Sequence, residues 1–197
     1  MGKRLSLLVL GSTISSLGIS MLIKSGLGCF SVTAANMALA RWLGVTIGIS
    51  GMIVELIMLS IATYKGEGVG WTALINATYG SLIIDFFNLI VPSHPLMALG
   101  VFLLPIGWSY MGRAGLGDSG SNILTRAIVK QTGKSLGFIR GIQEFVFLVV
   151  GLLGARHCIT WLTVVLTFGL GYLLEFEYKL LKYNPITIKH QFIIKGK

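Results

Sequence analysis

Long apolar segments alternate with short polar ones along the chain. Six of these segments approach the ~20 residues that an α-helix needs to cross ~30 Å of hydrocarbon. The pattern therefore predicts an all-α fold, a polytopic membrane bundle of about six spanning helices. The predicted spans are residues 5–23, 46–64, 71–91, 96–112, 135–154 and 159–181.

Two shorter segments lie between these spans, at residues 29–43 and 118–132. As helices of about 15 residues they would extend only about 22 Å, which is too short to cross a bilayer. Both are also more polar than the spans, and each follows a Gly-Leu-Gly sequence at 26–28 or 115–117. We expect two re-entrant or interfacial half-helices, each beginning after a glycine break.

The two halves of the chain resemble each other at a constant offset of 89 residues. A gapless match of glycines, bases and acids over about 60 residues predicts an internal duplication. Repeat one would cover about 5–91 and repeat two about 96–181. Equivalent pairs include Lys24 and Arg113, Gly26 and Gly115, Gly28 and Gly117, and Glu55 and Glu144.

The relative orientation of the repeats depends on how many times each one crosses the membrane. Three crossings per repeat force the second repeat to enter from the opposite side, as in the inverted repeats of many transporters. If the short segments also cross, each half has four spans and the repeats are parallel. The inverted arrangement is the one that we favour.

Charge supports a membrane location and sets an orientation. The chain of 197 residues is 54% hydrophobic and only 12% charged, with a net charge of +9. So few charges argue against a soluble or a disordered protein. The basic residues lie between apolar segments and at the two ends, which argues for a role in membrane topology and against nucleic-acid binding. Lysine and arginine lie before the first span, between the fourth and fifth spans and after the sixth span, which predicts that both termini are cytoplasmic. We expect one transmembrane domain over 1–182 and a basic cytoplasmic tail over 183–197, in which alternation hints at a short strand.

The glycine breaks carry the predicted substrate site. Glycine permits positive φ and close backbone approach, and the polar residues that follow are helix-capping types. A half-helix that starts inside the membrane directs free N–H groups and a positive dipole end toward a solute. The alternative is a tight loop followed by an amphipathic surface helix. The candidate solute-binding residues are Lys24, Gly26, Gly28, Ser31, Thr33, Arg113, Gly115, Gly117, Asp118, Ser119, Ser121 and Asn122.

Four further charged residues fall in or near predicted spans. Glu55 and Glu144 occupy equivalent places, and a carboxylate within a span is costly unless it faces a cavity or a partner. One interpretation is that these glutamates carry protons or bind a cation. The other is that they form structural ion pairs, and Arg140 stands four residues before Glu144, a spacing at which helical side chains pair well. For Asp85 we favour a role as a buried hydrogen-bonding partner or helix-end residue over a role in coupling transport to an ion.

No catalytic signature is present, because the sequence lacks Walker, HExxH and GxSxG motifs. We expect no enzymatic activity, no catalytic residues, no cofactor and no metal. Cys29 and Cys158 lie far apart in sequence and predict no disulfide framework.

The function predicted first is a small transporter or permease for a small polar or anionic solute, bound between the two repeats. The alternative is a non-transporting membrane binding subunit or an accessory component of a larger membrane complex. A lipid-handling intramembrane enzyme is a third and weaker interpretation. Expected partners are the lipid bilayer, the solute, and either a second copy of the chain or another membrane subunit.

The motifs IKSGLG and GRAGLG, followed by GVTIG and GKSLG and then a Gly-rich span, resemble those of the bacterial YczE/YyaS/YitT family of membrane proteins. The likeness covers most of residues 15–175. It implies a small multi-pass inner-membrane protein whose molecular function is largely unassigned. Many members carry proline and an acidic residue soon after the Gly-x-Gly turn. Here 29–31 lacks both, and the second half keeps only Asp118.

Overall fold

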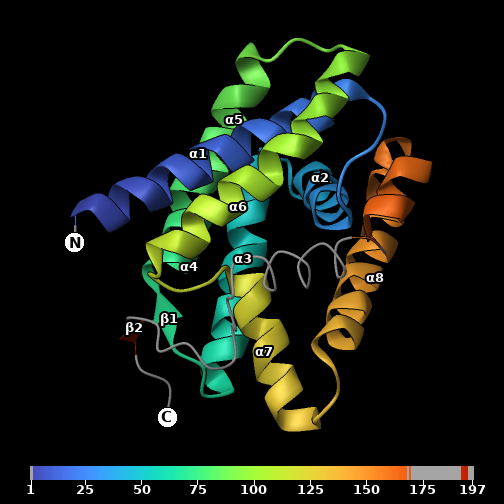
Figure 1. Cartoon of the computed structure of the whole chain (residues 1–197). Coiled ribbons are helices and arrows are strands. Elements are labelled where there is room, and N and C mark those ends of the chain that lie inside the picture. The colour runs from blue at the N-terminus through green and yellow to red at the C-terminus, as the bar shows by residue number, and fades with distance from the viewer. Residues whose placement is uncertain (1, 168, 170–191, 195–197) are drawn as a thin grey trace.

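The computed structural model describes residues 2–167, 169 and 192–194, and it is a bundle of helices (Figure 1). Among the described residues, one π-helical turn is present, η1 (Asn76–Gly80). Two 3₁₀ helices are also present there, η2 (Pro95–Phe102) and η3 (Arg156–Cys158). The α-helices are α1 (Gly2–Ser25), α2 (Ser31–Leu43), α3 (Ile47–Tyr64), α4 (Trp71–Ile75), α5 (Ser81–Ile90), α6 (Leu103–Ala114), α7 (Gly120–Thr132) and α8 (Leu136–Gly154).

Within the described residues, five helical segments are long and apolar enough to cross a membrane. They coincide with the first five predicted spans, so the prediction of a helical multi-pass membrane protein is confirmed. The predicted span 159–181 lies mostly outside the described residues, although 161–167 is helical. The five segments are Gly2–Ser25, Ile47–Tyr64, Trp71–Ile90, Pro95–Ala114 and Leu136–Gly154.

Two short helices stand between these spans, as the sequence predicts. Helices α2 and α7 contain 13 residues each, and their first residues are 89 positions apart. Each ends on a left-handed glycine, Gly44 with φ 66° and Gly133 with φ 68°. Only glycine adopts this conformation without steric cost, so the sequence fixes where both helices stop.

The breaks before the short helices are also alike. Gly26 and Gly115 have φ values of 68° and 62°, and Gly28 and Gly117 have values of 121° and 115°. After the short helices, Thr46 and Ser135 cap α3 and α8 by accepting hydrogen bonds from the N–H groups three residues on. The predicted correspondence of residues is therefore matched by a correspondence of backbone conformation.

Helices α1 and α6 pack closely through glycines. A Cβ on Gly11 would lie 2.6 Å from the carbonyl oxygen of Gly107, and a Cβ on Gly107 would lie 2.6 Å from that of Gly11. Gly18 and Gly100 stand in the same mutual relationship at 2.7 Å; Gly100 lies in η2, which forms one span with α6. Small residues allow such backbone contact between membrane helices. Because position 11 meets 107 and position 18 meets 100, the two helices run antiparallel.

A stripe of serines joins α1 to the segment from η1 to α5. The hydroxyls of Ser12, Ser16 and Ser20 occupy one face of α1, because they are four residues apart. All three donate to partners 64 residues further along the chain, so the two segments run parallel. The acceptors are Asn76 Oδ1, the carbonyl of Gly80 and the carbonyl of Ile84.

Each short helix packs against a span of the other half. Figure 1 shows α2 beside α8, and α7 beside the lower part of α3. Apolar clusters fill the space between elements; one joins Leu22, Phe30 and Leu104, and another joins Leu59 to Ile123. Near the chain end, β1 (Val69–Gly70) pairs antiparallel with β2 (Phe192–Ile194). This short strand falls where the tail alternation hints at one; the rest of the predicted tail 183–197 lies outside the described residues.

Candidate functional site

A cavity of about 250 Å³ lies between the two halves of the chain. The segments that follow both glycine breaks contribute to its wall: Phe30 and Thr33 come from the start of α2, and Asp118 and Ser119 come from the turn before α7, beside Gly117 of the second break. The volume lies just below the ~300–1,000 Å³ typical of ligand pockets, so the cavity suits a small solute. The starts of both short helices therefore face one cavity, although of the four break glycines only Gly117 lines it.

The predicted site residues divide into two groups of equal size. Those that line the cavity are Thr33, Glu55, Gly117, Asp118, Ser119, Ser121, Asn122 and Arg140. Those that do not line it are Lys24, Gly26, Gly28, Ser31, Asp85, Arg113, Gly115 and Glu144.

The two bases Lys24 and Arg113 are placed differently from the prediction. Both stand in the last turn of a helix, α1 or α6, where a cation interacts favourably with the helix dipole. Arg113 is exposed, and neither side chain lines the cavity. The basic character that they were expected to give the site is therefore absent from its wall.

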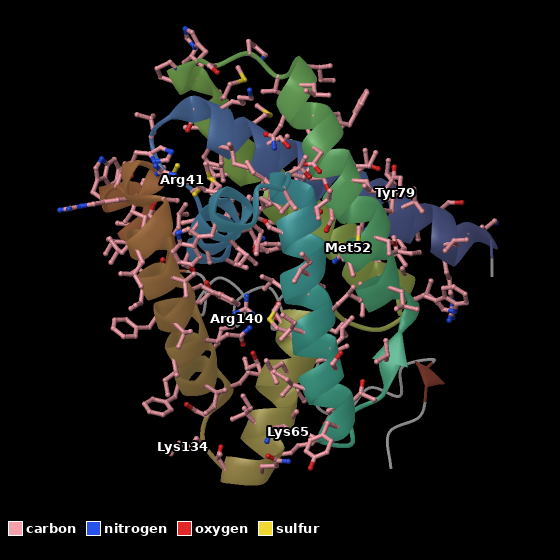
Figure 2. All side chains as sticks on the ribbon, turned by 180° about the vertical axis from the view of Figure 1, so that it is seen from behind. Arg41, Met52, Lys65, Tyr79, Lys134 and Arg140 are labelled. Carbon is pink, nitrogen blue, oxygen red and sulfur yellow. The ribbon has the colours of Figure 1, made fainter. Side chains whose placement is uncertain are left out.

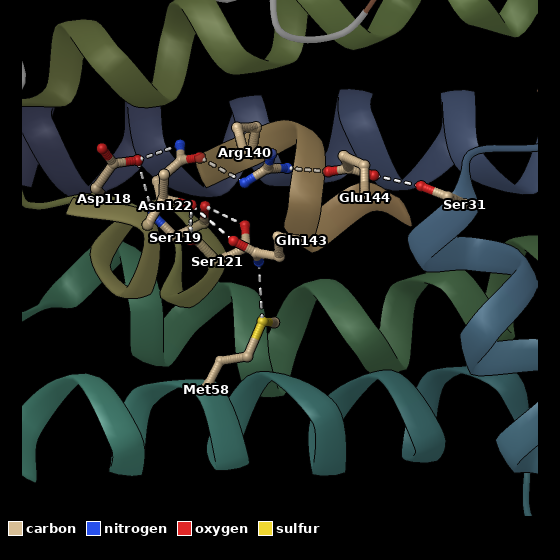
Figure 3. Close-up of polar contacts among 10 residues, drawn as sticks. Ser31, Met58, Asp118, Ser119, Ser121, Asn122, Arg140, Gln143 and Glu144 are labelled. Atoms are coloured by element: carbon tan, nitrogen blue, oxygen red, sulfur yellow. Dashed lines mark hydrogen bonds and ion pairs between the residues drawn. The ribbon is translucent and has the colours of Figure 1, made fainter. Parts of the chain in front are cut away.

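A continuous polar chain crosses from the cavity to the start of α2 (Figure 3). Asn122 donates to Asp118 Oδ1 at 2.7 Å, and Arg140 Nη1 donates to Asn122 Oδ1 at 3.0 Å. Arg140 Nη2 then pairs with Glu144 Oε1 at 2.7 Å, and Ser31 donates to Glu144 Oε2. Both members of the ion pair are buried, and Figure 2 shows Arg140 in the interior of the bundle. Structural pairing, one of the two interpretations of Glu144, is what the contacts show.

Glu55 is placed like Glu144 but partnered differently. Its Oε1 accepts a hydrogen bond of 2.5 Å from the N–H of Gly120, the first residue of α7. Glu144 accepts from Ser31, the first residue of α2. Each glutamate thus binds the N-terminus of the other half's short helix, where the helix dipole favours a negative charge. Glu55 lines the cavity, whereas Glu144 lies behind Arg140.

The site is not symmetric in charge. Arg140 and Gly51 occupy equivalent positions at the offset of 89, and both line the cavity. At this position the first half therefore places a glycine, which has no side chain, on the cavity wall, whereas the second half places a guanidinium there. Sequence comparison of the halves alone shows this difference, and the structure places it at the cavity wall.

Asp85 has a local structural role. Its carboxylate accepts from Thr46 Oγ1 at 2.5 Å and from the N–H of Gly48 at 2.8 Å, at the start of α3. These contacts agree with the helix-end interpretation of this residue and tie α5 to α3.

Several lining residues were missed by the sequence reasoning. Trp108 lines the cavity, and its ring centroid lies 6.3 Å from that of Phe30. Thr72 and Asn76, one helical turn apart, also line it. Their spacing was the available signal, since polar residues four apart share a helix face.

The described part of the chain contains neither a cluster of metal-ligating side chains nor a disulfide bond. There, no group of three or more His, Cys, Asp or Glu side chains is arranged to hold a metal ion. Cys29 and Cys158 are both free thiols, although Cys29 Sγ lies 4.0 Å from the carbonyl oxygen of Cys158.

Comparison with known proteins shows a family and a relative that the chain resembles, and neither description names an activity. A model described as "Family of unknown function (DUF6198)" matches residues 2–96, a stretch that encloses the predicted first repeat. "Uncharacterized membrane protein YczE" of Bacillus subtilis (strain 168) is 29% identical over 180 residues, covering 85% of this chain and 81% of that protein. Both matches support a YczE-like membrane family. The resemblance drawn from the glycine motifs is thereby confirmed. No solved structure matches the chain.

Proposed function

We propose that the chain is a small membrane transporter or permease for a small polar solute, bound between its two halves. The observation that carries the proposal is the cavity whose wall includes the starts of both short helices, α2 and α7. Secondary transporters bind their solutes at such breaks, where half-helix ends meet between repeats. Non-helical backbone at membrane depth is tolerated where it lines a cavity.

We further propose that the halves are inverted repeats with three crossings each. In a two-fold relationship, if position i of one unit contacts j of the other, then j of the first contacts i of the second. At the offset of 89, Gly11 corresponds to Gly100 and Gly18 to Gly107, so the contacts Gly11–Gly107 and Gly18–Gly100 exchange with each other. Since α1 and α6 are antiparallel, the supporting two-fold axis is perpendicular to them and lies in the membrane plane. Residues 159–181 would complete the six spans.

The orientation that we propose has both termini in the cytoplasm, across the plasma membrane. In Figure 2, Lys65 and Lys134 lie at one end of the bundle, and Arg41 lies toward the other. The first end would be cytoplasmic, in keeping with its excess of lysine. The pairing of β2 with β1, which follows α3, supports a C-terminal segment on that same side.

The proposal assigns the chain no catalytic step, and it does not retain the preference for an anion. That preference depended on the helix N-termini together with Lys24 and Arg113, and these two bases do not line the cavity.

Uptake into proteoliposomes tests the proposed function. Labelled choline, glycerol and lactate serve as probes of positive, zero and negative charge, and protein-free liposomes give the background. We expect at least one probe to enter faster with the protein present. Gly112→Phe should abolish this uptake, because Gly112 lines the cavity and a Cβ added there would meet no atom within 4 Å, so the ring has space to enter. Gly141→Phe is the matched control, on the exposed surface of α8.

The same experiment distinguishes the alternative. Uptake of no probe above background, together with binding of a probe to the purified protein, would favour a non-transporting binding subunit. Equal uptake by the wild type and Gly112→Phe would place any transport path outside the cavity and overturn the proposal.

A further inference from the structure

We propose that the cavity binds a small organic ammonium ion. This inference rests on the proposed function for its transport aspect, but the binding site itself stands on the contacts below. Among the described residues, three charged side chains line the cavity: Glu55, Asp118 and Arg140. Their balance decides the sign of the preferred solute.

Arg140 contributes no uncompensated positive charge. Its guanidinium pairs with Glu144 at 2.7 Å, and Glu144 lies outside the cavity wall. The remaining ion pairs within the described residues join Glu67 to Arg126 and Lys130, away from the cavity. Glu55 and Asp118 take part in none of these pairs, so the wall carries two carboxylates beyond what its single base balances.

The hydrogen bonds of the two acids leave acceptor positions. Glu55 accepts from the N–H of Gly120, and Asp118 accepts from Ser119 N and Asn122 Nδ2 through the same oxygen, Oδ1. A carboxylate accepts about four hydrogen bonds, so each acid retains capacity for a cationic donor. The dipole at the start of α7 supplies only about half a positive charge, which leaves the wall negative.

Two further polar groups point to a donor-bearing ligand. Thr72 is 3% exposed, lines the cavity, and its Oγ1 has no hydrogen-bond partner among the described residues. Asn36 also lines the cavity, and its Oδ1 is equally without a partner in that part of the chain. Buried polar atoms ordinarily have a partner. Both oxygens are acceptors, and an ammonium N–H is a donor that suits them.

The rest of the wall suits the organic part of such an ion. Phe30, Met58, Trp108 and Met111 line the cavity, and the first and third form the tilted aromatic pair described above. Aromatic faces attract ammonium groups through their quadrupole, with tryptophan the strongest. A cavity of about 250 Å³ has room for a compact cation with a short tail.

Binding to the purified full-length protein in detergent tests the inference. The probes are choline, its neutral isostere 3,3-dimethylbutan-1-ol, its anionic isostere 3,3-dimethylbutanoate, and protonated n-butylamine. Isothermal titration calorimetry gives the affinities. We expect at least one of the two cations to bind about tenfold more tightly than the neutral and anionic isosteres, the factor expected of one favourable charge interaction.

Two substitutions remove charge while keeping the acceptor oxygens. Glu55→Gln retains Oε1 for Gly120, and Asp118→Asn retains Oδ1 for Ser119. Each should weaken cation binding about fivefold or more without changing the circular dichroism spectrum. Asp85→Asn removes an acid that does not line the cavity and should leave the affinity unchanged.

Three results would overturn the inference: no binding of either cation, equal or tighter binding of the anion, or unchanged cation affinity in both cavity variants. These results are separate from those of the uptake assay. Cation binding without uptake leaves this site intact and refutes transport, whereas selective uptake of glycerol or lactate supports transport and refutes the cationic preference.

Discussion

Ser31 donates a hydrogen bond to Glu144, and the residues 89 positions away from each, Gly120 and Glu55, are hydrogen-bonded to each other. In both cases the glutamate belongs to one half of the chain and the start of the short helix belongs to the other. A carboxylate at a helix N-terminus satisfies a free N–H or hydroxyl and interacts favourably with the dipole. The two short helices are thus held reciprocally, each by the other half.

Removal of the Glu144 carboxylate should destabilise the protein strongly. Glu144→Ala leaves Arg140 buried without its counter-charge, which typically costs about 3–5 kcal/mol. Thermal unfolding of the detergent-solubilised protein would measure the loss as a lowered Tm.

A double variant tests whether the cost comes from the unpaired charge. Arg140→Met with Glu144→Met replaces both charges by apolar groups and should recover much of the lost stability. Additive effects in the corresponding double-mutant cycle would contradict a direct interaction between the two side chains.

The glycine seam between α1 and α6 should not tolerate a methyl group. Gly107→Ala places a Cβ 2.6 Å from the carbonyl oxygen of Gly11, and overpacking of this kind costs about 1–3 kcal/mol. The matched substitution Gly141→Ala lies in open space on α8 and should be neutral or slightly stabilising. Equal melting temperatures for the two variants would show that the helices do not approach this closely.

The side of the membrane on which each loop lies can be measured directly. With three crossings per half, reporter fusions at residues 92–95 and at the C-terminus should report opposite sides of the membrane. Four crossings per half would place both on the same side and contradict the inverted arrangement. A fusion in the 65–70 segment should report the same side as the C-terminus, since β1 lies there and pairs with β2.

Loss of the Asp85 cap should weaken the start of α3. Asp85→Ala removes the acceptor of the Gly48 N–H and of the Thr46 hydroxyl, and the loss of a cap costs about 0.5–2 kcal/mol. Asp85→Asn retains one acceptor and should cost less. The order of the melting temperatures, wild type above Asn above Ala, checks this, and a stability of Asp85→Ala equal to the wild type would refute the capping role.

Features that depend on local backbone chemistry could be predicted from the sequence. Glycines with positive φ, capping hydroxyls and the length of an apolar segment act within a few residues, so the first five spans and both short helices agree closely with the prediction. The offset of 89 added long-range information, because equivalent residues adopt equivalent conformations.

Features that depend on helix rotation and partner choice could not be predicted. Lys24 and Arg113 stand next to the glycine breaks in the sequence, yet neither lines the cavity. Which side of α1 or α6 faces the cavity depends on how each helix is rotated about its own axis. Trp108 and Thr72 reach the wall only because α6 and α4 face it. In a helix that is apolar on all sides, a single sequence does not specify which face packs against which neighbouring helix.

The guanidinium at position 140, matched by a bare glycine at position 51, has an energetic consequence. A carrier made of two like halves reaches its second state when the halves exchange roles, and perfect likeness would make both states equally populated. Here the exchange would set a fixed positive charge against a different set of neighbours. Under the proposed transport cycle the two states would therefore differ in free energy, and the empty protein would face one compartment more often than the other.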